Sequence, residues 1–418
     1  MSFIGTIGAN NCLEENMRIC YILPTFAISG GVMVVLEHAN RLAELGFDVS
    51  LVNTAATNSL DWFSHSRLKL YSRHSNYPKA FDVVIVTGWT TAYLARLMDL
   101  DASRWIYLVQ SDESRFTPRS SVESMLAKTS YQAPYEYLVI ANWMKGWLTA
   151  TYGTSATVIT NALNPTIMFP DPPLVPRSTK LRVLIEGPIH TEYKGMDDAF
   201  AAVKHLDAEV WCVSNGTPKP GQRYDRLLKC VPYAEMRRVY SSCDVLLKMS
   251  KVESFGYPAL EMMACGGTAV ITRYTGHEEY ARDGENCFVV EIGGVAAATE
   301  KLRLLSRDSA LLEKLKDNAR KTAEQKSNWD TSIDILQKCL ESPPTQVLQW
   351  TAFERRAFEA LAVVTEKFVV DYHNNTLSAS SDCLRRLIHL ESKIARLKKY
   401  SGIDVFRRIV NVRHLFRP

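Results

Sequence analysis

The residues whose types and spacing best suit chemistry are two glutamates, Glu253 and Glu261, within residues 250–270. An apolar strand pattern precedes Glu253, and a helical pattern carries Glu261. We therefore predict that Glu253 lies in a loop and that Glu261 lies about two turns into the following helix, on a similar face. Backbone N–H groups and the helix dipole at such a junction attract phosphate. Because carboxylates accept hydrogen bonds from hydroxyl groups, the stretch predicts a site for a ligand with both phosphates and hydroxyls.

The elements that must position these glutamates alternate between strand and helix patterns. Strand patterns occupy residues 18–23, 47–52, 82–87, 105–109 and 137–140, and again residues 181–185, 209–213, 244–249 and 269–272. Strands that are joined by helices form parallel sheets, so we predict an α/β fold with two doubly wound halves. A proline-dense segment, residues 171–178, lies between the halves and is predicted to be a linker.

Polar residues that follow predicted strands are candidates for binding, because sheets of this kind bind ligands beyond the carboxyl ends of their strands. Gly30 and Gly31 form either a phosphate-binding turn or a turn that needs glycine only for backbone freedom. The full G-x-G-x-x-G pattern is missing there, which argues against a dinucleotide cofactor. Gln110 follows another strand of the first half. Lys194 precedes a helix of the second half, where a flexible positive charge suits a pyrophosphate.

The segment around the two glutamates resembles the signature of glycosyltransferase family 4, the retaining GT-B glycosyltransferases with a Glu-x7-Glu motif. The positions that agree are Glu253, Phe255, Gly256, Leu260, Glu261, Met263, Ala264, Cys265 and Gly266. The resemblance covers roughly residues 17–342. It implies the GT-B fold, in which two Rossmann-like doubly wound lobes enclose a central cleft, and to this the sequence adds a C-terminal helical extension.

The resemblance also implies how the chain is divided. Residues 17–170 are expected to form the N-terminal acceptor lobe, and residues 178–326 the C-terminal nucleotide-sugar lobe. A final helix, residues 327–342, is expected to cross back to the first lobe. Residues 1–16 are predicted to be a flexible leader, and residues 345–418 a helical basic tail.

By this resemblance, Glu253 and Lys194 are the expected catalytic residues. Lys194 would meet the donor phosphates, Glu253 would hold sugar hydroxyls, and Glu261 would hold the ribose hydroxyls. The full set expected to bind the nucleotide sugar is Gly30, Gly31, Gln110, His190, Lys194, Tyr233, Glu253, Ser254, Phe255, Gly256 and Glu261.

The family pairs this lysine with an arginine shortly upstream, but residues 188–190 contain no arginine. Neutralisation of the phosphates is therefore left to Lys194 with His190, or to a basic residue elsewhere, such as Lys248 or Lys251. The resemblance implies no metal ion, because GT-B enzymes use side chains and helix dipoles. It also implies no cofactor, since the nucleoside-diphosphate sugar is the donor substrate.

The implied function is transfer of a hexosyl or deoxyhexosyl group to a growing polysaccharide of O-antigen, capsule or S-layer type, expected to be lipid-linked. The sequence from Gln110 to Glu113 is similar to the branch that contains polysaccharide rhamnosyltransferases, which hints at the donor. Three alternatives stay open: a non-catalytic GT-B scaffold of a glycan assembly complex, a GT-B sugar-nucleotide epimerase, and a storage-sugar synthase.

Composition restricts the compartment and the partners. No apolar run reaches the roughly 18 residues that a membrane span requires. The nine cysteines are scattered and are predicted to be reduced thiols in a cytoplasmic protein. Residues 382–418 contain ten basic and three acidic residues, whereas the whole chain has a net charge of only +4. The basic tail is predicted to contact either an anionic membrane surface, on the inner face of the cytoplasmic membrane, or a partner protein. Nucleic acid is disfavoured, because no binding motif accompanies the charge.

Overall fold

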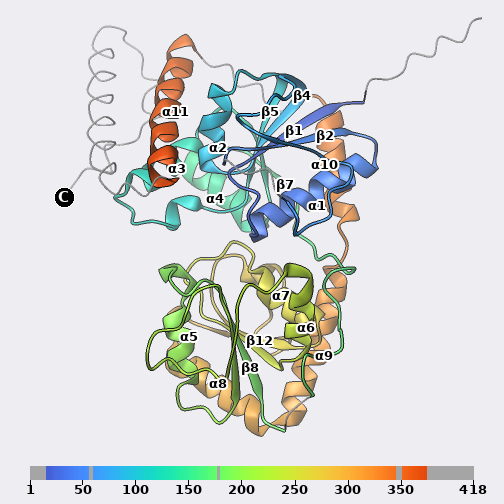
Figure 1. Ribbon diagram of the computed structural model, residues 1–418, viewed down its shortest axis with the longest axis vertical. Coiled ribbons are helices and arrows are strands. Elements are labelled where there is room, and N and C mark those ends of the chain that lie inside the picture. The colour runs from blue at the N-terminus through green and yellow to red at the C-terminus, as the bar shows by residue number, and fades with distance from the viewer. Residues whose placement is uncertain (1–15, 56–59, 177–178, 345–350, 374–418) are drawn as a thin grey trace, which may run out of the picture.

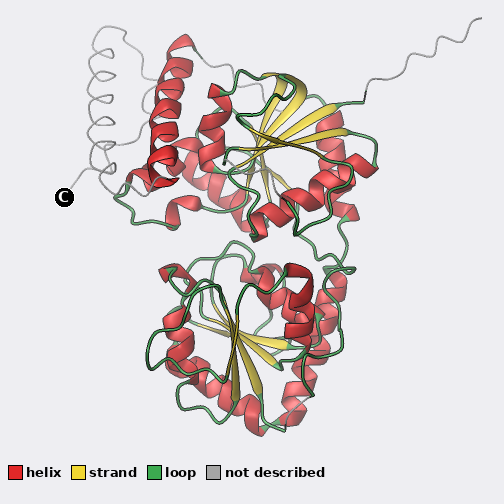
Figure 2. Cartoon of the chain, viewed as in Figure 1, coloured by secondary structure: helices red, strands yellow, loops and turns green. Residues whose placement is uncertain are grey.

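The computed structural model describes residues 16–55, 60–176, 179–344 and 351–373, and it has two lobes, each built around a sheet (Figure 1). Helices flank the strands in both lobes (Figure 2). The predicted leader lies outside the described residues except for Asn16, as does the predicted tail except for residues 351–373. The two helix-covered sheets confirm the predicted α/β fold with two Rossmann-like lobes.

The N-terminal sheet has the strand order β3-β2-β1-β4-β5-β6-β7, and its neighbouring strands are parallel. Its strands are β1 (Arg18–Leu23), β2 (Asp48–Asn53), β3 (Lys69–Ser72), β4 (Ala80–Val86), β5 (Asp101–Val109), β6 (Glu136–Val139) and β7 (Thr157–Val158). Its helices are α1 (Gly30–Glu44), α2 (Trp89–Leu94), α3 (Val122–Ser130) and α4 (Asn142–Tyr152), with the 3₁₀ turns η1 (Ala95–Leu97) and η2 (Glu113–Arg115). The central strands are almost wholly apolar, because helices cover both faces of the sheet.

The C-terminal sheet repeats this topology in the order β10-β9-β8-β11-β12-β13, again with parallel neighbours. Its strands are β8 (Arg182–Glu186), β9 (Glu209–Val213), β10 (Arg226–Leu228), β11 (Val245–Lys248), β12 (Thr268–Thr272) and β13 (Phe288–Val290). Its helices are α5 (Met196–Val203), α6 (Met236–Ser241), α7 (Tyr257–Ala264), α8 (Val295–Arg307) and α9 (Ser309–Gln325), with the 3₁₀ turns η3 (Glu192–Lys194), η4 (Tyr233–Glu235) and η5 (His277–Glu279). Figure 1 shows α5 and α8 on one side of this sheet and α6, α7 and α9 on the other.

Both strand orders reverse direction at the centre of the sheet, between β1 and β4 and between β8 and β11. Open parallel sheets bind ligands at this switch point, beyond the carboxyl ends of the strands. The sequence predictions missed four strands and misplaced one glutamate. The strands β3, β7, β10 and β13 were not predicted. Glu261 lies about one helical turn after the start of α7, not two, because the helix begins only at Tyr257.

Loops that follow strand ends join the two lobes. Hydrogen bonds between them include Tyr257 Oη to Ala162 O (3.1 Å), Trp143 Nε1 to Ser254 O (2.9 Å), Arg115 NH1 to Thr275 Oγ1 (2.9 Å) and Asn142 N to Glu279 Oε1 (2.8 Å). Each residue follows the carboxyl end of a strand, so the binding edges of both sheets face the same interface. Helix α10 (Asp330–Glu341) then returns the chain to the N-terminal lobe, where it packs against α1 (Figure 1).

The described part of the tail is one long helix, α11 (Ala352–His373), which packs against α2 (Figure 1). The Phe358 ring stacks on Tyr93 with centroids 4.5 Å apart. An ion pair between Arg73 and Glu366 adds a polar contact. Phe358 therefore helps to dock α11 on the N-terminal lobe. The strongly basic part of the tail, residues 382–418, lies outside the described residues.

Replacement of Phe358 by alanine is expected to lower the free energy of unfolding by about 3–5 kcal/mol, because a buried ring and its stacking contact are lost. The measurement is urea unfolding followed by circular dichroism. Val363→Ala is the matched control, since Val363 lies on the same helix but is 57% exposed. Equal stabilities for the two variants would show that α11 does not contribute to the folded lobe.

No helix in the described residues is long and apolar enough to cross a membrane. The cysteines in these residues are free thiols, and five of them are buried. This agrees with the prediction that they are reduced thiols, whereas Cys12 and Cys383 lie outside the described part.

Candidate functional site

The two predicted catalytic residues meet at the switch point of the C-terminal sheet. Lys194 Nζ lies 2.8 Å from Glu253 Oε1. Ser250 Oγ donates a second hydrogen bond of 3.0 Å to the same oxygen. Lys194 ends η3, which follows β8, whereas Ser250 and Glu253 follow β11. The fold thus unites a cation and a carboxylate that lie 59 positions apart in the sequence.

The local backbone explains why lysine is followed by glycine here. Gly195, which has a φ of +63°, directly follows η3, and α5 begins at the next residue. Glycine adopts this left-handed conformation without a steric penalty, so the chain can turn sharply between η3 and α5. Lys194 is left beside a helix N-terminus, where the helix dipole adds to its attraction for an anion.

A second ion pair occupies the same edge of the sheet. Lys248, the last residue of β11, donates hydrogen bonds of 2.8 Å to both the carboxylate and the carbonyl oxygen of Glu186, at the end of β8. Burial disfavours the charged ammonium, but Glu186 and Glu253 outweigh it and raise the pKa of Lys248. Burial also opposes ionisation of Glu253, yet Lys194 and Lys248 hold its pKa below the ordinary value. Glu253 is therefore a carboxylate at neutral pH.

Glu261 is held by two tyrosines rather than by a cation. Gly256, with a φ of +83°, precedes α7, and a Cβ there would lie 2.2 Å from Tyr274 Oη, so only glycine fits this turn. One turn later, Glu261 accepts hydrogen bonds from Tyr233 Oη (2.9 Å) and Tyr240 Oη (3.0 Å). The side chain is buried, and burial raises the pKa of Glu261 to about 7. A carboxylate here can accept hydrogen bonds from ligand hydroxyls that replace a tyrosine hydroxyl.

The raised pKa predicts how stability depends on pH. Folded Glu261 holds its proton up to about pH 7, whereas the unfolded chain releases it near pH 4.3. The folded state binds more protons between these values, so the free energy of unfolding falls as pH rises through this range, by on the order of 3 kcal/mol. Glu261→Gln is expected to flatten this decline between pH 5 and pH 8, measured by urea unfolding. Part of the decline should remain in this variant, because burial also raises the pKa of Glu113 to about 7.

Glu285→Gln serves as the control for this pH series, because Glu285 is exposed. It should reproduce the wild-type profile. Parallel profiles for wild type and Glu261→Gln would contradict the assigned pKa of Glu261.

Ser254 and Phe255 connect Glu253 to α7. The carbonyl of Ser254 accepts a hydrogen bond from Trp143 Nε1 in the other lobe, so lobe contact fixes this loop. Phe255 is 3% exposed, and its ring packs against Tyr257 and Tyr280. The predicted ligand contact of Phe255 is thus limited to its backbone, because the ring belongs to the core.

The N-terminal lobe brings its three predicted residues together at the start of α1. Ser29 caps this helix by accepting from Val32 N. A Cβ on Gly31 would lie 3.4 Å from the Gln110 amide, and one on Gly30 would lie 3.8 Å from the Tyr257 ring of the other lobe. Gln110 Oε1 is buried and has no hydrogen-bond partner among the described residues. The Gly30–Gly31 turn therefore lies against Gln110 and the beginning of α7.

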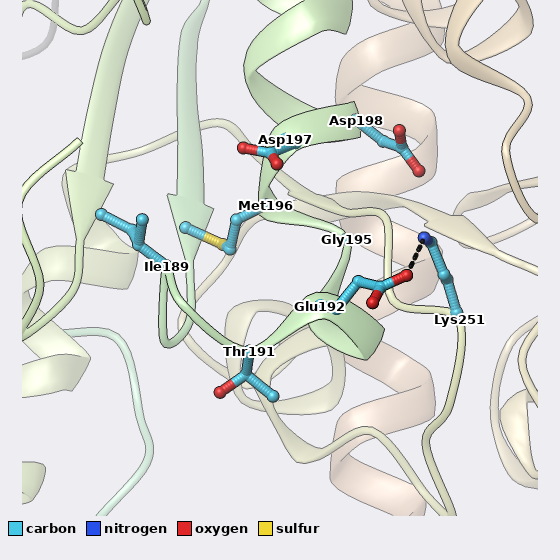
Figure 3. Close-up of a pocket in the computed structure, with 8 residues that line it drawn as sticks. All are labelled: Ile189, Thr191, Glu192, Gly195, Met196, Asp197, Asp198 and Lys251. Atoms are coloured by element: carbon cyan, nitrogen blue, oxygen red, sulfur yellow. Dashed lines mark ion pairs between the residues drawn. The ribbon is translucent and has the colours of Figure 1, made fainter. Parts of the chain in front are cut away.

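The other basic candidates face different surroundings. The imidazole of His190 lies against the loop after β9, since its Nε2 would be 3.2 Å from a Cβ on Gly216. Lys251 Nζ lies 3.5 Å from the carboxylate of Glu192, which is 92% exposed. Figure 3 shows this pair beside a pocket at the start of α5. His190 and Lys251 thus lie at the rim of the site. Lys248 lies inside the cluster of charged side chains that consists of Lys194, Glu253, Lys248 and Glu186.

The structure adds residues that the sequence analysis did not include. Tyr240 holds Glu261 from 21 positions away. Glu186 pairs with Lys248, and Trp143 fixes the loop after Glu253. Glu113, which the sequence analysis named only as the end of the Gln110–Glu113 segment, accepts a hydrogen bond of 2.8 Å from the backbone N–H of Trp89. Tyr240, Glu186 and Trp143 belong to no local motif, and among these three only Glu186 could have been indicated by its position at a strand end.

Two Rossmann-like lobes with facing strand ends define the GT-B class of folds. Sucrose-phosphate synthase from Thermosynechococcus elongatus superposes with a TM-score of 0.65 at 16% identity, over 77% of this chain and 98% of that chain. HepE from Anabaena, in complex with UDP-glucose, superposes with a TM-score of 0.62 at 12% identity, over 78% of this chain and 100% of that chain. At these identities the likeness shows the shared fold alone.

The sequence comparisons add a family match. Residues 225–322 match the family model described as glycosyl transferases group 1, and this segment contains Glu253 and Glu261. The O-antigen biosynthesis protein RfbC from Myxococcus xanthus is 27% identical over 272 residues. The match covers 62% of this chain but only 21% of the length of RfbC.

Proposed function

We propose that this chain is a retaining glycosyltransferase that moves a sugar from a nucleoside-diphosphate sugar to a growing cell-surface polysaccharide. The observation that carries the proposal is the Lys194–Glu253 pair at the switch point of the C-terminal sheet. Glu253 lies within the segment that matches glycosyl transferases group 1. The structural neighbour HepE was solved in complex with UDP-glucose, which supports a nucleotide sugar as the donor.

Sugar transfer requires both a positive and a negative group at the carboxyl-end edge of the C-terminal sheet. Cleavage of the bond between the anomeric carbon and the phosphate oxygen places positive character on the sugar ring and negative charge on the departing diphosphate. Lys194 and the N-terminus of α5 stabilise the diphosphate, because fixed donors act where the negative charge develops. Glu253 accepts hydrogen bonds from sugar hydroxyls. The acceptor hydroxyl oxygen then takes the place of the diphosphate on the anomeric carbon, and its proton passes to the departing diphosphate oxygen.

Glu261 binds the nucleoside part of the donor. Its two oxygens are held by Tyr233 and Tyr240, and Tyr233 begins η4, next to Trp62 of the other lobe. Ribose hydroxyls replace the Tyr233 hydroxyl on the carboxylate. Gln110 and the Gly30–Gly31 turn approach the donor from the N-terminal lobe, and the unpartnered Gln110 oxygen supports this role. No metal ion takes part.

The acceptor is proposed from the relatives. RfbC is named for O-antigen biosynthesis, and a capsular polysaccharide glycosyltransferase from Staphylococcus aureus matches over a shorter stretch. The acceptor is therefore a lipid-linked glycan, and the transferred sugar a hexose or deoxyhexose, with rhamnose first among the candidates. The proposed enzyme works in the cytoplasm, where its basic tail contacts either an anionic membrane surface or a partner protein.

The proposal is tested by thermal unfolding of the full chain with UDP-, GDP- and dTDP-sugars and with the free nucleotides. A true donor raises the unfolding temperature by mass action, with a stabilisation of about 2.7 kcal/mol at 100 times its Kd. We expect one nucleotide series to stabilise the protein and the others to have no effect. The proposal is wrong if none of these compounds shifts the transition. A donor that is epimerised without any acceptor would assign the site to an epimerase.

A further inference from the structure

Lys248 has an unusual setting for a lysine. Its side chain is 4% exposed and lies at the central switch point, between the ends of β8 and β11. An ammonium group has three N–H bonds, and Glu186 accepts two of them. Gly187, directly after Glu186, lies close to this ammonium, because a Cβ at this residue would lie 3.4 Å from Lys248 Nζ and 3.3 Å from Met196 Sδ. The place where such sheets bind ligands thus holds a preformed buried cation.

The balance of charges in the site indicates a role for the Lys248 ammonium. A nucleoside diphosphate adds two or three negative charges to a cluster that already contains Glu186 and Glu253. Lys194 supplies only one positive charge, and it is engaged with Glu253. His190 and Lys251 lie at the rim, so Lys248 is the second cation within the cluster among the described residues. A buried positive charge is strongly attracted to phosphate, because little water screens it.

We propose that Lys248 is the second phosphate-binding cation of the donor site, and that Glu186 positions its ammonium. This inference rests on the proposed function. Lys194 approaches the diphosphate from the start of α5, and Lys248 approaches it from the end of β11, past Gly187. The phosphate takes the remaining N–H of Lys248, so the Lys248–Glu186 pair persists when the donor binds.

The test is isothermal titration of the full chain with UDP, GDP and dTDP, and with the corresponding nucleosides. Lys248→Met is expected to weaken binding of the preferred diphosphate by about 10- to 100-fold, the range for a hydrogen bond to a charged group. Binding of the nucleoside, which has no phosphate, should stay within about threefold of wild type. Lys251→Met, which removes a rim lysine, is the matched control and should bind the diphosphate like wild type.

Because Lys248→Met leaves Glu186 without its cation, the double variant Lys248→Met/Glu186→Gln tests the same point without an unpaired carboxylate. It should show the same selective loss of diphosphate binding. Unchanged diphosphate affinity, or an equal loss for diphosphate and nucleoside, overturns the role of Lys248 while leaving the donor site intact. Failure of wild type to bind any of the three diphosphates overturns the donor site itself, and this inference with it.

Discussion

Glu253→Gln should lower the rate of sugar transfer by at least about 100-fold, the effect of removing one charged group that stabilises a transition state. The substitution keeps the shape of the side chain but removes its charge, so Lys194 loses its partner at 2.8 Å. Sugar hydroxyls lose a strong acceptor at the same time. The measurement is release of nucleoside diphosphate from the donor in the presence of acceptor glycan.

The matched control for this variant is Glu291→Gln, because Glu291 is 76% exposed and pairs with Arg273 at the surface. It should transfer sugar at the wild-type rate. A Glu253→Gln enzyme that keeps full activity would show that Glu253 takes no part in the reaction, whatever the identity of the donor.

Gly195→Ala has the second large expected effect. A Cβ at this position would lie 1.8 Å from the carbonyl oxygen of Met249, and the φ of +63° is itself unfavourable for alanine. Because the clash is with backbone, either η3 or the loop after β11 must move. We expect the free energy of unfolding to fall by about 2–6 kcal/mol, combining backbone strain with overpacking. Lys194, the adjacent residue, should move with its turn, so nucleotide binding weakens as well.

The control Gly221→Ala separates backbone strain from the steric clash of the added Cβ. Gly221 has a φ of +84°, but a Cβ there meets nothing within 4 Å. Only the backbone term of about 1–2 kcal/mol applies, so this control should lose less stability and keep its nucleotide affinity. Both variants are compared by urea unfolding and by titration with the preferred nucleotide. Equal losses in the two would contradict the close approach of Gly195 to the strand end.

The sequence predicted the inner strands of both sheets but missed the outer ones. Inner strands are buried on both faces and appear as continuous apolar runs, as in residues 18–23. The missed strands β3, β7, β10 and β13 are all at the sheet edges and have only two to four residues. An edge strand pairs on one side only, so its sequence need not be apolar throughout. Whether such a segment forms a strand depends on its pairing with the neighbouring strand.

The sequence predicted which residues belong to the candidate site, but it did not predict which side chains contact each other there. Residue type and local context indicated Glu253, Glu261 and Lys194, since each lies at a strand end or helix start. The contacts between them depend on how distant segments meet: Lys248 and Glu186 are 62 positions apart in sequence. A local pattern carries no information about such a distance. For Phe255 the motif predicted a ligand contact, but it did not reveal that the ring is buried.

The most direct measurement of the central claim is a crystal structure of the full chain with its stabilising nucleoside diphosphate bound. The phosphate oxygens should lie at the ends of β8 and β11, about 3 Å from Lys194 Nζ, with the ribose hydroxyls on Glu261. A nucleotide bound away from the switch point of the C-terminal sheet would contradict the proposed donor site.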